Sequence, residues 1–130
     1  MEKNGNQTQP SVTVLVIDDD PAVRNSLKFS LELEGFAVRL YAGGRALLDD
    51  EHLPVRGCLV VDQVMPGMPG LDVVDALRDR GVLMPAVLIT SGASRTLRQQ
   101  AAQAGVVIVE KPFFSNGLVD AIRKLLAQDF

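Results

Sequence analysis

The sequence predicts an α/β domain in which five parallel strands form a single sheet with helices on both faces, a doubly wound architecture. Two observations lead to this prediction. Short apolar runs alternate with amphipathic helical stretches five times along the chain, and neither a large insert nor an internal repeat interrupts the series. Alternation of this kind is typical of parallel sheets, because each crossover returns the chain through a helix that packs on the sheet.

The composition is that of a single globular domain. The chain has 130 residues, of which 47% are hydrophobic and 22% charged, so it can bury a core without disulfides. Its net charge of -3 argues against a nucleic-acid-binding surface, where a basic patch is expected. The single cysteine, Cys58, excludes an internal disulfide and a cysteine-rich zinc site.

The two ends of the chain are expected to lie outside the domain. Residues 1–10 are polar and lack the apolar core of a signal peptide, so we expect a disordered tail and a cytoplasmic location. No apolar stretch reaches the length of a membrane span, and we expect no membrane partner. The domain is placed at residues 11–127, and residues 128–130 are interpreted as a tail or the start of a linker.

The first strand and the first helix are clearly marked. Residues 12–17 are continuously apolar, apart from one threonine, which predicts a strand buried on both faces. Asp20 is the expected N-cap of the following helix, rather than a metal ligand, because Pro21 then takes the first helical position. Gly35 marks the end of this helix. Its apolar stripe recurs at helical spacing: Val23, Leu27 and Leu31.

The remaining elements follow the same alternation. Strands are expected at 36–41, 58–61, 86–89 and 106–109, and helices at 44–50, 69–80, 94–104 and 115–127. Gly81 and Gly105 follow two of these helices, as glycine often does where a helix ends.

Polar side chains fall where four of these strands end. They are Asp18 and Asp19 after the first strand, Asp62 after the third, Thr90 and Ser91 after the fourth, and Lys111 after the fifth. The carboxyl ends of parallel strands meet at one edge of the sheet, where ligands bind. Singly, each residue has an ordinary explanation as a turn residue, a β-former or a solvated side chain. Together they predict a functional site.

The chemistry of these side chains favours a magnesium-assisted phosphoryl site. Adjacent carboxylates such as Asp18 and Asp19 repel each other unless a cation lies between them. Mg²⁺ keeps several waters and combines one or two carboxylates with phosphate oxygens. Asp62 could be both a metal ligand and a nucleophile, since carboxylates form acyl phosphates. Lys111 would offset charge on the phosphoryl oxygens, and Thr90 would donate a hydrogen bond to one of them.

Four motifs at these positions resemble those of a response regulator receiver domain of bacterial two-component signalling. They are Val16-Ile17-Asp18-Asp19-Asp20, the segment 61–70 around Asp62, Leu88-Ile89-Thr90, and Glu110-Lys111-Pro112-Phe113. They occur in the family's order and near its spacing, so the resemblance covers about residues 12–127 and implies a (βα)5 flavodoxin-like fold. The Asp18–Asp20 run with Val23-Arg24 looks most like receivers that precede a helix-turn-helix DNA-binding domain.

The resemblance implies a role for each motif residue. Asp62 would accept a phosphoryl group from a sensor histidine kinase or a phosphotransfer protein. Asp19 and Asp62 would bind Mg²⁺ directly and Asp18 through water, with the backbone carbonyl of Val64 as the remaining protein ligand. Such a domain is a signalling phosphoacceptor rather than an enzyme, although it assists its own phosphorylation and dephosphorylation. It would bind no nucleic acid itself.

The resemblance also implies how the domain would respond. Lys111 would pair with Asp62 and then with the phosphate, across a cis Lys111-Pro112 peptide. Thr90 would move toward a phosphoryl oxygen and draw the following loop with it. The output surface would comprise the fourth helix, the fifth strand and the fifth helix, through which the family often forms homodimers.

Three residues depart from the family's usual pattern. Ile108 stands three residues before the lysine, where many receivers have Tyr or Phe, so the usual threonine–aromatic coupling is expected to be weaker or different. Val64 and Gly92 flank the expected approach of a hydrolytic water, and neither offers a polar side chain to orient it. We therefore expect phosphorylated Asp62 to lose its phosphate slowly.

A phosphatase resembling the haloacid dehalogenase superfamily is the alternative. Asp18 would then be the nucleophile, with a second acid two residues on, and Leu88–Ser91 would match that family's second motif. The late acidic pair on a strand and the cap domain of that family are absent from the sequence, and Asp62 would have no role. A flavin carrier fits less well, since three acids after the first strand would repel a flavin phosphate.

Overall fold

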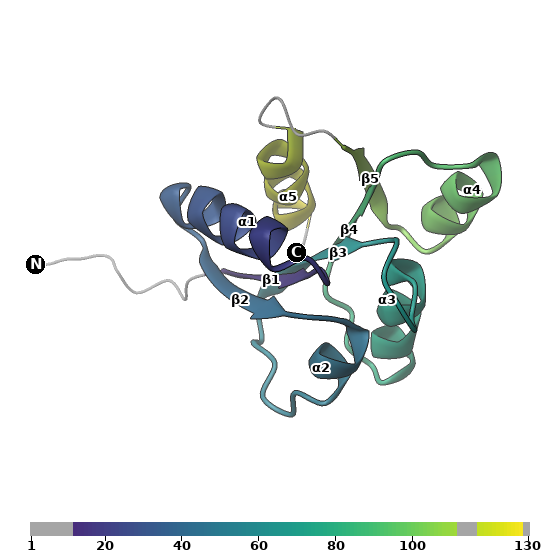
Figure 1. Ribbon diagram of the computed structural model, residues 1–130. Coiled ribbons are helices and arrows are strands. Elements are labelled where there is room, and N and C mark those ends of the chain that lie inside the picture. Colours follow the sequence, from purple (N-terminus) through teal and green to yellow (C-terminus); the bar gives the residue numbers. More distant parts are fainter. Residues whose placement is uncertain (1–11, 112–116, 129–130) are drawn as a thin grey trace, which may run out of the picture.

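Five parallel strands form one sheet in the computed structural model, which describes residues 12–111 and 117–128 (Figure 1). The strands are β1 (Thr13–Ile17), β2 (Ala37–Tyr41), β3 (Gly57–Asp62), β4 (Ala86–Thr90) and β5 (Val107–Glu110). The helices are α1 (Pro21–Leu33), α2 (Gly44–Leu48), α3 (Gly70–Asp79), α4 (Arg95–Gln103) and α5 (Gly117–Ala127). The predicted architecture is confirmed, and the bounds differ from the predicted ones by one or two residues, as is usual at element ends.

The strand order β2-β1-β3-β4-β5 puts the three most apolar strands in the middle of the sheet. Every residue of β3 and β4 is buried, and so is every residue of β1 except Thr13. The edge strands β2 and β5 have exposed or half-buried residues along most of their length. Continuous apolar runs therefore mark the central strands, because helices cover both of their faces.

The helices divide the core into two layers. On one face, α2, α3 and α4 pack over side chains such as Leu15, Leu59 and Leu88. On the other face, α1 and α5 pack over alternate residues of the same strands, among them Val16 and Val60. Figure 1 shows α1 and α5 together on one side of the sheet and α2 and α3 on the other. This arrangement leaves the ends of the strands uncovered.

Local signals in the sequence set the helix ends. Asp20 is the N-cap of α1, as predicted, and its Oδ1 accepts the N–H of Ala22 at 2.9 Å. Ser94 caps α4 in the same way, accepting the N–H of Leu97 at 3.1 Å. Helices α1, α3 and α4 each end before a glycine with positive φ, a conformation that is costly for other residues.

Side chains tie neighbouring elements together. Arg80, the C-cap residue of α3, donates from Nη1 to the Leu48 carbonyl at the end of α2, at 2.5 Å. Arg78 of α3 donates to the carbonyl of Ala104, the C-cap residue of α4. At the edge strand β2, the Tyr41 hydroxyl donates to Asp50 Oδ2 at 2.5 Å. The two arginine contacts satisfy helix carbonyls that have no partner within their own helix.

Some predictions fall outside the described residues. These are the disordered tail at 1–10, the cis Lys111-Pro112 peptide, the start of the last helix at residue 115 and the end of the tail or linker at 129–130. Within the described ranges, none of the helices is both long and apolar enough to cross a membrane.

Candidate functional site

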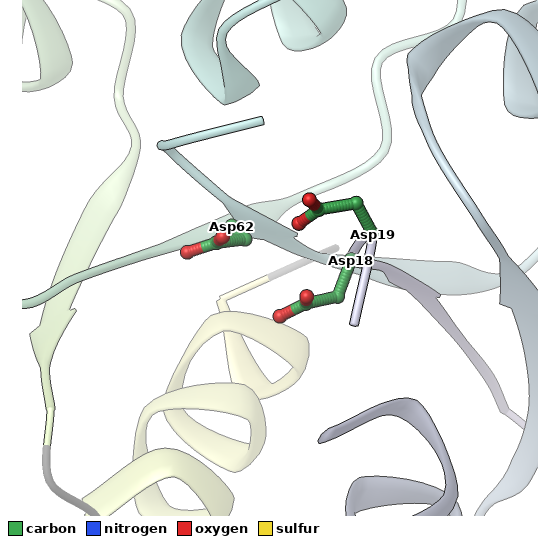
Figure 2. A group of neighbouring side chains, drawn as sticks. All are labelled: Asp18, Asp19 and Asp62. Atoms are coloured by element: carbon green, nitrogen blue, oxygen red, sulfur yellow. The ribbon is translucent and has the colours of Figure 1, made fainter. Parts of the chain in front are cut away.

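The acidic residues lie at the switch point of the sheet. Parallel β1 and β3 are neighbours in register, with Ile17 opposite Val61, yet the chain leaves them toward helices on opposite faces. Asp18 and Asp19 follow β1, and Asp62 ends β3, so the three side chains emerge at the same edge (Figure 2). One carboxylate oxygen from each lies within 4.8 Å of the others. This is the place where doubly wound sheets bind their ligands.

The electrostatics of this group call for a cation. The exposed fraction is 2% for Asp18 and 6% for Asp62, whereas Asp19 is open to solvent. Burial raises the pKa of Asp62, and the negative charge of Asp18 raises it further, while Lys111 opposes both effects. Three hard oxygen donors with unfavourable mutual charge fit a divalent ion such as Mg²⁺. The described residues thus form an acidic pocket that could bind a metal.

The predicted lysine and threonine join this group from the next two strands. Lys111 Nζ lies 3.4 Å from Asp62 Oδ1, and the Lys111 N–H donates to the Thr90 carbonyl at 2.8 Å. Thr90 is 3% exposed, and its Oγ1 lies 3.3 Å from both the carbonyl oxygen and the N–H nitrogen of Gly92. Among the described residues, the hydroxyl bonds only within its own loop, at a distance typical of weak hydrogen bonds.

The turn that carries Asp18 and Asp19 is closed by hydrogen bonds to both of its ends. Asp18 Oδ1 accepts the N–H of Asp20 at 2.9 Å, and the Asp18 carbonyl accepts from Arg24 Nη1 at 2.7 Å. The Asp18 N–H donates to the Tyr41 carbonyl of β2 at 3.1 Å. An aspartate that bonds the backbone two residues on is typical of tight turns. Together these bonds hold the carboxylates of the turn in place.

The segment after Asp62 is held by Gln63 and Gly70. The Gln63 N–H donates to the Ile89 carbonyl at 2.8 Å, and Gln63 Oε1 accepts the N–H of Leu71 at 2.9 Å. A Cβ on Gly70 would lie 2.4 Å from the Asp62 carbonyl oxygen, so only glycine fits there. The start of α3 thus packs directly on the end of β3.

The predicted site residues therefore converge, and their individual roles remain predictions. Asp18, Asp19, Asp62, Thr90 and Lys111 lie together at this edge. Val64, two residues beyond Asp62, has a side chain that is 73% exposed and carries no polar atom, so any metal ligand at this position would be its backbone carbonyl. Ile108 on β5 is half-buried against the layer that contains α4.

Sequence reasoning missed three supporting residues: Arg24, Gln63 and Gly70. The position of Arg24, one helical turn after the N-cap, was a signal that its side chain can reach back over the turn. The contact of Gly70 with a carbonyl had no signal beyond a glycine in a Pro-Gly loop.

Comparisons with known proteins agree with this arrangement. A family model described as the response regulator receiver domain matches residues 14–123. The chain is 39% identical over 119 residues to the transcriptional regulatory protein FixJ of Azorhizobium caulinodans, covering 91% of this chain and 56% of that protein. It is 38% identical over 120 residues to the C4-dicarboxylate transport transcriptional regulatory protein DctR of Rhodobacter capsulatus, covering 90% of this chain and 61% of that protein.

A solved structure gives the same result. The crystal structure of FixJ-N superposes with a TM-score of 0.82 at 32% sequence identity, covering 92% of this chain and 96% of that one. The chain spans 56% and 61% of the length of the two curated relatives. With a family model that matches most of the chain, and with these relatives and this fold, the chain belongs to the response regulator receiver domain family and is a receiver of two-component signalling.

Proposed function

We propose that Asp62 is the phosphoacceptor of this receiver, and that a sensor histidine kinase or a phosphotransfer protein is its donor. The observation that carries the proposal is the position of Asp62. It is the one predicted site residue that lies both within 4.8 Å of the Asp18 and Asp19 oxygens and 3.4 Å from the ammonium group of Lys111. A nucleophilic carboxylate with acidic ligands on one side and a cation on the other suits phosphoryl transfer.

The metal in this proposal is Mg²⁺. It would be held by the carboxylates of Asp18, Asp19 and Asp62, with the backbone carbonyl of Val64 as a further ligand. Bound there, the ion supplies positive charge that offsets the charge of the incoming phosphoryl oxygens. Asp62 could then stay ionised, which its burial and the charge of Asp18 otherwise oppose.

The residues of the chain then share the chemical step. A carboxylate oxygen of Asp62 attacks phosphorus, the bond from phosphorus to the donor nitrogen breaks, and the electron pair of that bond leaves with the donor imidazole. The product is an acyl phosphate on Asp62. Lys111, already beside Asp62, turns its ammonium group to the phosphoryl oxygens and offsets their charge.

Switching would begin at Thr90. Its hydroxyl would exchange the two 3.3 Å contacts with Gly92 for a shorter hydrogen bond to a phosphoryl oxygen. Since Gly92 lies on the loop that enters α4, this exchange would move the start of α4. With Ile108 on β5 in place of an aromatic residue, the shift would reach β5 through packing alone, without a ring that changes rotamer.

The same surface is proposed for self-association. Within the part of the chain that the structure describes, the edge strand β5 pairs with β4 alone. A cavity of about 330 Å³ lies between β5 and α5 and is lined in part by Val107 and Leu125. Apolar edge strands favour association with a second chain. A homodimer through α4, β5 and α5 would cover this edge. FixJ and DctR are transcriptional regulatory proteins, and a role in transcription is proposed for this chain by analogy.

The phosphatase alternative receives no support from the comparisons. It would require Asp18 as the nucleophile, but Oδ1 of that residue accepts the Asp20 N–H and its backbone carbonyl accepts from Arg24. These bonds suit a fixed ligand better than an attacking group. We therefore propose no turnover of an external phosphate ester by this chain.

One experiment tests the proposal. The protein is incubated with MgCl₂ and acetyl phosphate, and the modified residue is identified by mass spectrometry after reductive trapping. The expected adduct is on Asp62, and it disappears in Asp62→Asn and in the presence of EDTA. As a matched control, Asp75→Asn changes an exposed aspartate on α3 and should leave labelling unchanged. An adduct on Asp18, or ester hydrolysis that survives Asp62→Asn, would overturn the proposal.

A further inference from the structure

Arg24 has an unusual position for a cation beside a metal site. It lies on the first turn of α1, is half-buried, and directs its guanidinium group toward the acidic turn rather than into solvent. By charge alone, a guanidinium group near the carboxylates would repel a divalent ion. Its hydrogen bonds suggest the opposite effect on metal affinity.

Arg24 binds the acidic turn at both ends. Its backbone N–H donates to the Asp20 carbonyl at 3.0 Å, and its Nη1 donates to the Asp18 carbonyl at 2.7 Å. Asp19, an expected direct ligand, lies between these two anchored residues. Among residues 12–111 and 117–128, no other donor bonds to the Asp18 carbonyl. The side chain of Arg24 therefore fixes the peptide that joins Asp18 to Asp19.

The rest of the turn depends on the same geometry. Asp18 Oδ1 is bonded to the N–H of Asp20 at 2.9 Å, which leaves Oδ2 for the ion or its water. If the peptide after Asp18 rotated, this bond and the direction of the Asp19 carboxylate would change together. Residues that orient metal ligands through hydrogen bonds typically alter affinity about 10- to 100-fold when removed.

We propose that Arg24 is a positioning residue for the magnesium site. Its side chain holds the Asp18–Asp20 turn so that the carboxylates of Asp18 and Asp19 present their oxygens to one ion. This inference rests on the proposed function, because it concerns the ion assigned there to Asp18, Asp19 and Asp62. It assigns a role to the helix that follows the acidic turn, and it predicts that removing a positive charge weakens the binding of a positive ion.

The test compares Mg²⁺ affinities of three variants by isothermal titration calorimetry with MgCl₂ alone, without a phosphodonor. Arg24→Met removes the hydrogen bond and the charge, and Mg²⁺ should bind about tenfold more weakly. Arg24→Lys keeps the charge and one donor, and should recover part of the affinity. Lys28→Met is the matched control. It removes one positive charge from the same helix, where Lys28 pairs with Glu32 at 2.9 Å, and should leave affinity unchanged or slightly tighter.

A kinetic readout separates positioning from a general loss of fold. In the acetyl phosphate reaction, Arg24→Met should need about tenfold more Mg²⁺ for half-maximal rate but reach the wild-type rate at saturation. Circular dichroism of each variant confirms that the fold is intact. If Arg24→Met fails to fold, Arg24→Lys carries the comparison, with an affinity between the expected Met value and that of wild type.

The outcomes distinguish this inference from the proposed function. If the wild-type protein binds Mg²⁺ and Arg24→Met binds it equally or more tightly, the inference about Arg24 is overturned while the proposed metal site stands. Arg24 would then act on the ion through its charge and not by positioning the turn. A saturating rate that stays low at high Mg²⁺ would also overturn it. A wild-type protein that takes up no Mg²⁺ overturns the proposed metal site and this inference with it.

Discussion

The buried charge of Asp18 is expected to destabilise the metal-free protein and to contribute to Mg²⁺ binding. Replacing the carboxylate by an amide tests both effects. Asp18 is almost fully buried, and its negative charge raises the pKa of Asp62. In Asp18→Asn the amide oxygen can still accept the N–H of Asp20, so the turn is kept. We expect the free energy of unfolding of the metal-free protein to rise, and the extra stability given by Mg²⁺ to fall.

Urea unfolding in EDTA and in MgCl₂ measures both quantities. Asp75→Asn, on the exposed face of α3, serves as a control and should change neither. A metal-free Asp18→Asn protein that is less stable than wild type would show that the charge of Asp18 is compensated by groups other than an ion.

Val64 sets the expected lifetime of the acyl phosphate. Its side chain is exposed beside the site but has no polar atom to orient an attacking water. Phosphorylated Asp62 should therefore persist, and Val64→Asn should shorten its half-life several-fold by supplying a hydrogen-bonding group. Loss of label after removal of the phosphodonor gives the half-life. Val55→Asn, at an exposed valine outside the predicted site, should leave the half-life unchanged. A half-life of seconds for wild type would contradict this expectation.

For single residues, the sequence predicted which side chains belong to the site better than it predicted their contacts. Asp18, Asp62 and Lys111 were found because strand ends in a parallel sheet meet at one edge, whatever the side-chain rotamers. The bond from Arg24 to the Asp18 carbonyl depends on a long side chain folding back over a turn, which no periodicity encodes. For the same reason the sequence does not indicate that Arg98 pairs with Glu110.

The packing of α3 on β3 depends on the absence of a side chain at Gly70. A Cβ there would meet the Asp62 carbonyl oxygen at 2.4 Å and Val61 Cγ1 at 2.8 Å. Gly70→Ala should therefore shift α3 and destabilise the protein by about 1–3 kcal/mol. Thermal or urea unfolding measures the loss. Gly43→Ala is the matched control, because its backbone is extended and nothing lies within 4 Å of its Cβ, so a change of more than about 0.5 kcal/mol there would contradict this account.

Helix α4 buries few apolar side chains and is also held by a polar contact at its end. Ala101 is its only buried residue, and its end is bound by the contact from Arg78 to the Ala104 carbonyl. We expect backbone amides of α4 to exchange with deuterium faster than those of α3, and Arg78→Met to speed exchange at the end of α4 several-fold. Arg45→Met, which removes an exposed pairing on α2, should not. Equal exchange rates at the end of α4 in wild type and Arg78→Met would show that the contact from Arg78 does not stabilise that end of the helix.

The helices and strands were predictable because the spacing of apolar residues and the capping residues indicate the same elements along the chain. Asp20, Ser94 and Gly105 each carry a local signal that the structure confirms. The strand order was not encoded in the same way. Nothing in the apolar runs says that β1 lies between β2 and β3, since order depends on which edges pair after the helices cross over.

For the whole molecule, Cys58 links stability to pH. Burial in the sheet raises the pKa of its thiol from 9.0 to about 12. The folded protein thus holds the proton more tightly than the unfolded chain, so this contribution to stability is complete below pH 9.0 and is lost as pH rises toward 12. Relative to Cys58→Ala, wild type should lose about 1.4 kcal/mol of unfolding free energy per pH unit in that window.

Urea unfolding of both proteins at a series of pH values measures this difference. The native thiol should also resist alkylation at neutral pH until the protein unfolds. Rapid alkylation of the folded protein, or parallel stability profiles for wild type and Cys58→Ala, would show that solvent reaches Cys58.

Tyr41 gives the molecule an intrinsic optical signal. It is the only tyrosine, and the chain contains no tryptophan. Its carbonyl accepts the Asp18 N–H at 3.1 Å, while its hydroxyl donates to Asp50 at 2.5 Å. Tyrosine fluorescence is quenched when a carboxylate accepts the hydroxyl proton, so the fluorescence intensity of Tyr41 depends on its contact with Asp50. The backbone of the same residue is bonded to Asp18 in the acidic turn. The unlabelled protein can therefore report, in real time, on events at the end of β1.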